Sequence, residues 1–193
     1  MLELEALTNA RIRNEAGQLR LVAPEDRVSG AGTTPIMAAF THINPTPTRF
    51  SDGSYGVYYA AHDRETAIAE TVFGRERFLG ATNEAPIDLD MRVYCARVRG
   101  RFDDIRTEPE ESPLYDRVSY ATSSQYGRAR RLSGADGVVC RSVRNPAGEN
   151  LAAFRPRVIS NCYTAGYLGY RWNGRRIIDV FDKSGLWQPY PGQ

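Results

Sequence analysis

The chain has 193 residues, of which 41% are hydrophobic and 25% charged, so it is long enough to bury the core of one globular domain. Its net charge is only +2, which gives no support to nucleic-acid binding, and no apolar run approaches the roughly 18 residues of a membrane span. Residues 1–13 carry acidic groups where a signal peptide would be basic and then apolar. We therefore expect a soluble, cytoplasmic protein with a single domain over residues 1–193.

The cysteines, histidines and lysine limit the chemistry further. The cysteines are far apart and have neither the spacing of a zinc site nor the density of a disulfide scaffold, so we expect buried, reduced thiols. They are Cys95, Cys140 and Cys162. His42 and His62 show no metal-ligand spacing, and we expect no metal site. Lys183 is the only lysine, so the positive charge is carried by arginine, which pairs with phosphates and carboxylates through two parallel hydrogen bonds.

The first part of the chain predicts one helix and a long loop. Residues 2–13 (LELEALTNARIR) favour a helix, and residues 14–22 (NEAGQLRLV) are typical of a hairpin. Residues 29–47 mix Gly, Thr and Pro with one apolar island, IMAAF, which predicts a loop wrapped over the core. Gly30 and Gly32 in that loop could approach a phosphate with bare backbone, but the segment lacks the full dinucleotide fingerprint, so we do not predict a Rossmann fold.

A strand and a helix follow. Residues 57–61 (VYYAA) are rich in β-branched and aromatic types and predict a short strand. Asp63 is a good N-cap for a helix over residues 64–79, in which apolar residues recur at helical spacing. Glu70 lies near the edge of that apolar stripe.

The rest of the chain predicts mainly strands. The predicted strands cover residues 92–98, 137–143, 151–154, 167–172 and 175–181. A helix is expected within residues 118–132, and residues 103–113 are predicted to form an acidic, proline-containing loop. Asn173 and Gly174 lie between the last two strands, and this pair is the strongest short hairpin signal. Many strands with few helices predict the α+β class.

Residues 49–70 carry the most informative group of side chains. An arginine, a tyrosine-rich strand and a helical glutamate follow one another there: Arg49, Tyr58, Tyr59 and Glu70. An arginine offers forked donors to a phosphate, an aromatic ring offers a stacking face, and a carboxylate accepts from a sugar hydroxyl. The group suits a ligand with all three parts, such as a nicotinamide dinucleotide.

The same residues resemble the RES domain family, which is named for an arginine, a glutamate and a serine that recur in it. The matching positions are Arg49 in TRFSDG, Glu70 in TAIAE and Ser142 in VCRSVRNPAGEN. Tyr59 lies eleven positions before Glu70, which agrees with the family pattern. Asn150 matches an asparagine that recurs in the family after the serine turn. The resemblance spans residues 29–156.

Two positions depart from the family pattern. Phe50 and Ser51 stand where the family has tryptophan and asparagine, and the family's additional N-terminal arginine has only Arg27 as a candidate here. With Arg27 included, the resemblance implies that NAD is bound by Arg49, Tyr59, Tyr58, Ser142, Asn150 and Arg27.

RES proteins are toxins of bacterial toxin–antitoxin pairs, and their fold resembles that of ADP-ribosyltransferases, a split β-sandwich of two small sheets around an NAD cleft. The resemblance implies an enzyme that uses NAD as a co-substrate, cleaves its nicotinamide–ribose bond and transfers ADP-ribose to a protein target. It also implies a cognate helix-turn-helix antitoxin. The alternatives are an NAD glycohydrolase or phosphorylase that depletes NAD, and a catalytically silent nucleotide-binding module.

Each candidate side chain has a functional and an ordinary interpretation. Glu70 would stabilise the positive charge that develops on the ribose, or it is a surface glutamate of an amphipathic helix. Arg49 would clamp the pyrophosphate, or it forms a surface ion pair. One of Tyr58 and Tyr59 would contact the ligand, since they point to opposite faces of the strand. Ser142 would bind the ribose or the nicotinamide amide without acting as a nucleophile, or it satisfies its own turn.

Overall fold

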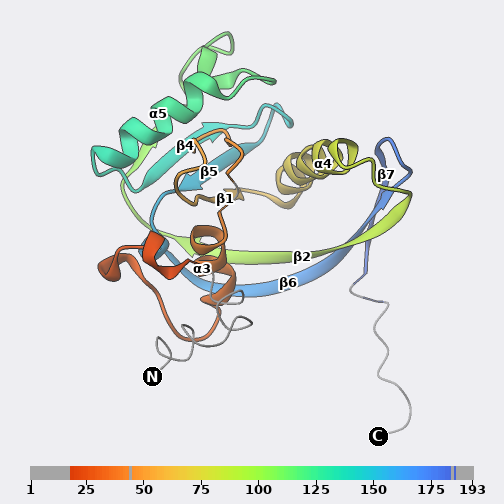
Figure 1. Ribbon diagram of the computed structural model, residues 1–193, viewed down its shortest axis with the longest axis horizontal. Helices are drawn as coiled ribbons and strands as arrows, with labels where there is room; N and C mark the ends of the chain where they lie inside the picture. Colours follow the sequence, from red (N-terminus) through yellow and green to blue (C-terminus); the bar gives the residue numbers. More distant parts are fainter. Residues whose placement is uncertain (1–17, 44, 184, 186–193) are drawn as a thin grey trace, which may run out of the picture.

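The computed structural model describes residues 18–43, 45–183 and 185, which form two separate β-sheets with helices packed around them (Figure 1). The first sheet has the order β1–β5–β4–β3, with bounds Tyr58–Ala61, Glu149–Ala153, Gly137–Arg141 and Phe102–Asp104. β1, β5 and β4 pair antiparallel, whereas β3 pairs parallel with β4. The sheet therefore joins strands from both halves of the chain.

The second sheet consists of β2 (Ile87–Val98), β6 (Ile159–Trp172) and β7 (Ile177–Asp182), all antiparallel. Register shifts interrupt the pairing of β2 with β6, and such bulges bend and twist a ribbon. Figure 1 shows the two strands as one long curved ribbon. The predicted hairpin between β6 and β7 is confirmed, because the Asn173 amide donates to the Arg176 carbonyl across the turn.

Three α-helices occur in the described part of the chain: α3 (Thr34–Thr41), α4 (Arg64–Ala81) and α5 (Ala121–Leu132). In Figure 1, α5 covers the first sheet, whereas α4 lies between that sheet and β7. Short 3-10 helices lie at Leu19–Leu21, Pro24–Asp26, Pro113–Tyr115 and Pro156–Val158. The predicted α+β class, with two small sheets and a few flanking helices, is confirmed. None of the helices in these described residues combines the length and the apolar character needed to cross a membrane.

The structure corrects the prediction of a loop over residues 29–47, because α3 lies within this segment. Pro35 sits in the first turn of α3, where its missing amide costs nothing, and Ile36 and Phe40 are four residues apart and buried on one face. Gly32 is not placed at a phosphate site, because a side chain there would overlap the carbonyl oxygen of Cys162 in β6.

One further segment differs from its prediction, and two others lie wholly or partly outside the described residues. The segment 103–113 does not begin as a loop, because β3 includes Asp103 and Asp104 and extends the sheet beside β4. The predicted helix over residues 2–13 lies outside the described residues. Of the predicted hairpin over residues 14–22, the described part contains the 3-10 helix Leu19–Leu21.

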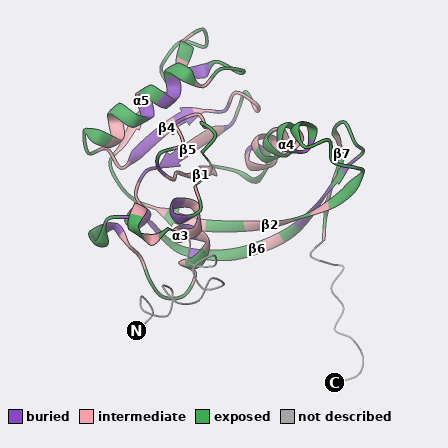
Figure 2. Cartoon of the chain, in the orientation of Figure 1, coloured by how far each residue is buried: buried purple, intermediate pink, exposed green. Residues whose placement is uncertain are grey.

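The first sheet has a hydrophobic cluster on each face. One cluster gathers side chains under α5, including Phe50, Tyr55, Val138 and Cys140. The other gathers side chains against α3 and the start of β6, including Ile36, Phe40, Ala153 and Ile159. Figure 2 shows buried residues in β4 and β5, which lie between the two clusters, and β6 also contains several. This sheet therefore lies between the two hydrophobic clusters of the fold.

The helix α4 contributes little to either cluster. Its buried residues are Thr66 and Leu79 alone, and Figure 2 shows most of the helix partly or fully exposed. The predicted N-cap is confirmed: the Asp63 side chain accepts hydrogen bonds from the Thr66 amide and hydroxyl. The Thr66 hydroxyl also accepts from the Asn145 side chain, which ties the start of α4 to the turn after β4.

Gly148 allows this turn to approach the start of α4. A Cβ at Gly148 would overlap the Thr66 side chain. We predict that Gly148→Ala lowers the free energy of unfolding by about 1–3 kcal/mol, because a methyl group forced into a packed contact displaces its neighbours. Urea denaturation measures this change.

Gly80→Ala is the matched control, because a Cβ at this exposed helical position meets no atom within 4 Å. It should leave stability unchanged or raise it by up to about 1 kcal/mol, since alanine favours the helix over glycine. Equal stability of the two variants would contradict the close contact.

Candidate functional site

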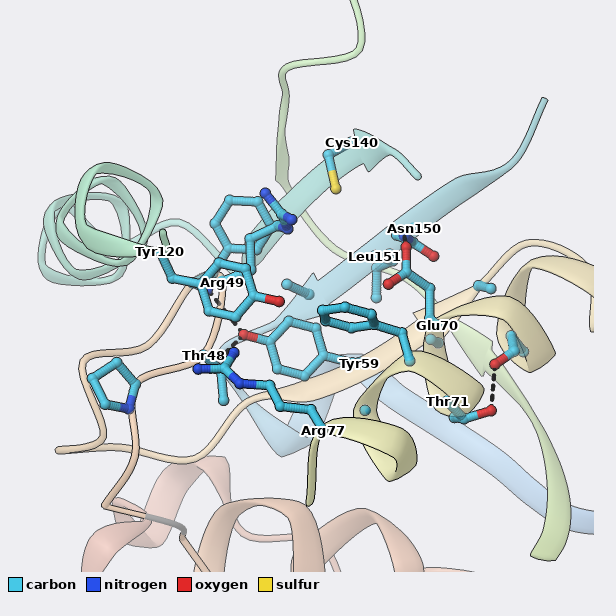
Figure 3. Close-up of a pocket in the computed structure, with 18 of the residues that line it drawn as sticks. Thr48, Arg49, Tyr59, Glu70, Thr71, Arg77, Tyr120, Cys140, Asn150 and Leu151 are labelled. Carbon is cyan, nitrogen blue, oxygen red and sulfur yellow. Dashed lines mark hydrogen bonds between the residues drawn. The ribbon is translucent and has the colours of Figure 1, made fainter. Parts of the chain in front are cut away.

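A cavity of about 520 Å³ lies between α4, one face of the first sheet and the loop before β1 (Figure 3). Its volume is within the usual range for small-molecule sites. The polar and aromatic side chains among its lining residues are Thr46, Thr48, Arg49, Phe50, Tyr59, Glu70, Thr71, Phe73, Arg77, Phe78, Tyr120, Cys140 and Asn150. The site therefore combines three chain segments that are far apart in sequence.

Strand register decides which side chains of the first sheet face the cavity. Tyr59 is paired with Ala152, and Asn150 is paired with both Ala61 and Cys140, so these positions share one face of the sheet. Tyr58 points to the opposite face and packs against the cluster beside α3. The structure thus places Tyr59, and not Tyr58, in the cavity.

One stripe of α4 forms the facing wall. Glu70, Phe73, Arg77 and Ala81 recur at spacings of three and four residues and line the cavity together. Phe73 belongs to the apolar residues that recur at helical spacing in the sequence, and it borders the cavity here.

The Glu70 carboxylate is held by two donors from the first sheet and its turn. The Ser142 hydroxyl donates to Glu70 Oε1 at 2.6 Å, and the Asn150 side-chain amide donates to the same oxygen at 2.7 Å. Within the described residues, no hydrogen bond reaches Oε2. The carboxylate is therefore fixed in orientation while one oxygen remains available to a ligand, and Figure 3 shows it beside Asn150.

Ser142 stabilises its own turn and also contacts Glu70. Its hydroxyl oxygen accepts from the backbone amides of Arg144 and Asn145, as expected for a serine that stabilises its own turn. The same hydroxyl donates its proton to Glu70. Ser142 is buried and is not a lining residue of the cavity, so it positions Glu70 from the side away from the cavity.

Arg49 lies at the opposite part of the cavity. Its Nη1 donates to the Leu114 carbonyl at 2.9 Å, and its guanidinium lies 5.0 Å from the centre of the Tyr120 ring. Arg77 approaches the same ring to 5.6 Å. Two guanidinium groups therefore flank one tyrosine, and Figure 3 shows both arginines directed into this part of the site.

The Tyr59 hydroxyl holds the loop that carries Arg49. It shares a 2.8 Å hydrogen bond with the Thr48 hydroxyl and accepts from the Phe50 amide at 3.0 Å, so the residues on both sides of Arg49 are attached to it. Burial of this hydroxyl raises the pKa of Tyr59 to about 12. The residue nevertheless has 45% of its surface accessible, which leaves the face of its ring open to a ligand.

The three cysteines lie in different environments. Cys140 is buried, as predicted, and it also lines the cavity although it is only 2% exposed. Burial raises the pKa of its thiol to about 12, so it stays protonated at neutral pH. Cys162 is buried as expected. Cys95 is exposed, contrary to the prediction, and it lies between two register shifts in the pairing of β2 with β6.

The sequence identified part of the site and missed part of it. Arg49, Tyr59, Glu70 and Asn150 line the cavity together. The structure places Arg27 elsewhere, where its Nε donates to the Val22 carbonyl. The residues missed were Arg77, Tyr120, Phe73 and Cys140. The spacing of Arg77 seven residues after Glu70 was the one signal that could have found it.

The side chains at the site are not arranged for a metal ion. Among the described residues, no group of three or more His, Cys, Asp or Glu side chains is close enough to hold one. Glu70 and Cys140 are the lining residues with such side chains, and Glu70 already accepts two hydrogen bonds on Oε1. The arrangement favours an organic ligand bearing an anionic group.

The fold and this constellation define a class of protein. The model of the RES domain matches residues 24–173, and the chain belongs to the RES domain family. RES domains are associated with NAD-related toxin–antitoxin systems, and RES proteins generally pair with an antitoxin.

A particular relative extends the match over most of the chain. The chain is 35% identical over 187 residues to an uncharacterized protein, y4oC, of Sinorhizobium fredii. The aligned region covers 96% of this chain and 77% of that protein. The shared region therefore includes both the first sheet and the helix that carries Glu70.

We predict that the three thiols differ sharply in reactivity. At pH 8, a thiol with a pKa of about 12 has roughly one thiolate in ten thousand molecules, and the thiolate is the reactive form. Iodoacetamide should therefore label exposed Cys95 in the native protein and spare Cys140, as mapped by mass spectrometry. Stability should fall as pH rises above about 8.5, because the unfolded Cys140 ionises there and the folded one does not.

The control is Cys95→Ser, which should abolish fast labelling of the native protein. Cys140→Ala should flatten the loss of stability between about pH 8.5 and 11, after allowance for its own cavity cost. Rapid labelling of native Cys140 at pH 8 would contradict its protonated state.

Proposed function

We propose that the protein is the toxin of a bacterial type II toxin–antitoxin pair, which cleaves the nicotinamide–ribose bond of NAD and transfers the ADP-ribose to a protein target. The observation that carries the proposal is the cavity in which one rigidly held carboxylate, Glu70, lies across the Tyr59 ring from Arg49. Membership of the RES domain family supports the same interpretation.

The charges that line the cavity fit such a ligand. Glu70 is the only acidic residue among the described lining residues, and Arg49 and Arg77 are the basic ones. A dinucleotide has a diphosphate for the arginines and ribose hydroxyls for the carboxylate. The ends of the cavity are therefore complementary to different parts of one molecule.

Glu70 would act on the charge that changes during the reaction. As the bond between ribose C1′ and the nicotinamide nitrogen breaks, the bonding electrons leave with nicotinamide and positive charge develops on the ribose. Glu70 accepts a hydrogen bond from a ribose hydroxyl through Oε2 and stabilises that charge more than the ground state. The acceptor then forms the new bond to C1′ and loses its proton.

Arg49 and Tyr59 would hold the substrate. The guanidinium has donors left beyond the one bound to Leu114 and directs them to the phosphates. The exposed face of Tyr59 supports the nicotinamide ring or its ribose by stacking. Fixing both groups lowers the entropic part of the barrier, because the ribose is presented to Glu70 in one orientation.

The rim of the cavity supports a macromolecular acceptor and an antitoxin. Pro47, Phe78 and Ala81 line the cavity and are exposed, with Phe78 at 58%. Exposed apolar side chains at the opening of a site can be buried by contact with another protein. We therefore propose that the target protein docks here, and that a helix-turn-helix antitoxin blocks the same opening.

Glu70→Gln tests the chemistry. The amide oxygen of the substituted side chain can still accept from Ser142 and Asn150, so the fold should be retained, while the charge is lost. We predict a fall in kcat for nicotinamide release of about 10²–10³-fold, with little change in KM. Release is measured by chromatography with purified protein, with and without cell extract.

Glu65→Gln, on the exposed first turn of α4, is the matched control and should retain activity. Adenine-labelled NAD locates the acceptor. Label retained on protein supports the transferase, whereas label found only in small molecules means that water or phosphate is the acceptor. NAD binding without nicotinamide release under either condition would instead show the catalytically silent module.

Asn150→Ala tests whether Glu70 must be held. Removing this donor leaves the carboxylate with Ser142 alone, and we predict a fall in kcat of about tenfold, the value of one charge-assisted hydrogen bond. KM should change by less than about threefold. Asn145→Ala removes a donor to Thr66 near the same helix and should change kcat less. Equal losses in both variants would mean that general anchoring of α4, and not orientation of Glu70, is what matters.

A further inference from the structure

Arg77 is a cation that no group in the described part of the chain neutralises. Among those residues it makes no hydrogen bond and no ion pair, and its one recorded contact is with the Tyr120 ring. Other arginines around the site have a polar partner: Arg49 has the Leu114 carbonyl, and Arg144 has the carbonyl of Arg117. A cation left with only an aromatic partner, at the wall of a cavity, has all five of its donors available.

Arg77 and Arg49 come from different elements and meet at Tyr120. Arg77 is carried by α4, and Arg49 lies in the loop before β1. Their guanidinium carbons lie 5.6 Å and 5.0 Å from the centre of the same ring. Like charges beside one ring repel each other, so an anion that bound both would relieve this repulsion.

The helix fixes the separation of Arg77 and Glu70 along its axis. Arg77 follows Glu70 by two turns on the same face, which is roughly 10 Å along the axis. The cavity is therefore divided into a carboxylate end and an end with two guanidinium groups. A ligand with a sugar at one end and two adjacent phosphates at the other matches that division.

We propose that Arg77 is a second phosphate-binding residue, and that it clamps a diphosphate together with Arg49 across the Tyr120 ring. The cavity thereby selects a dinucleotide over a nicotinamide mononucleotide. Each arginine binds one of the two phosphates, so a ligand with a single phosphate can use only one of them. That the site selects NAD over the mononucleotide rests on the proposed function, NAD cleavage. That Arg77 and Arg49 bind a diphosphate does not depend on it.

The test compares Arg77→Met with the wild type. Methionine keeps much of the length of the side chain and removes its charge. For NAD, we expect KM to rise about tenfold or more with kcat within about threefold, because a contact made equally in ground and transition states is lost. For nicotinamide mononucleotide, kcat/KM should change by less than about threefold. No change in KM for NAD, or equal losses for both substrates, would overturn the proposal.

Arg75→Met is the matched control. Arg75 lies on the same helix, is exposed and does not line the cavity. It should leave both substrates unaffected. A loss of NAD affinity equal to that of Arg77→Met would show that the general positive charge of α4 is responsible and would overturn the specific role of Arg77.

Binding of inorganic diphosphate separates this proposal from the proposed function. Diphosphate should raise the Tm of the wild type and of Arg75→Met, and raise that of Arg77→Met much less. If the wild type releases no nicotinamide from NAD but shows this pattern, the NAD chemistry fails and the diphosphate site stands. If diphosphate leaves the Tm of the wild type unchanged while nicotinamide is released, the Arg77 site fails and the NAD chemistry stands.

Discussion

The hydrogen bonds that Ser142 and Asn150 donate to Glu70 Oε1 attach the middle of α4 to the first sheet and the turn after β4. The helix buries only Thr66 and Leu79, so apolar packing does not hold it against the first sheet. A helix that packed its stripe directly on the sheet would fill the cavity. Hydrogen bonds hold the helix beside the sheet while leaving room for the cavity. The acceptor of these bonds is Glu70, the candidate catalytic residue. The hydrogen bonds that orient Glu70 in the site therefore also help to hold α4 beside the sheet.

The second sheet holds α4 from its other side. The hydroxyls of Thr71 and Tyr170 share a 2.8 Å hydrogen bond, and the Glu76 carboxylate accepts from the Ile177 amide at 2.7 Å. The start of β6 is buried in the cluster beside α3, where Ile159 is 2% exposed. One long strand thus connects the core of the first sheet to the helix. This connection explains why the ribbon of β2 and β6 extends so far beyond the core.

The sequence predicted those features that depend on interactions between residues close together in the chain. The cap at Asp63, the hairpin turn at Asn173 and the spacing of α4 each depend on residues within a few positions of one another, and all are confirmed. The failures depend on distant contacts. The sequence could not show that Tyr59 faces the cavity, since that follows from pairing with β5. Nor could it show that Arg77 meets Tyr120, because the loop and helix carrying Tyr120 are folded over the site by the chain that follows β3.

The neutral groups of the cavity are as important as the charged ones. Tyr59 and Cys140 both have a pKa raised to about 12 by burial, so neither adds negative charge to the site even in mildly alkaline solution. Among the described lining residues Glu70 provides the negative charge alone. The charge of the lining changes sign along the cavity, because Glu70 lies at one end and Arg49 and Arg77 lie at the other. A dinucleotide entering it can be oriented by charge before any of its rings is in contact.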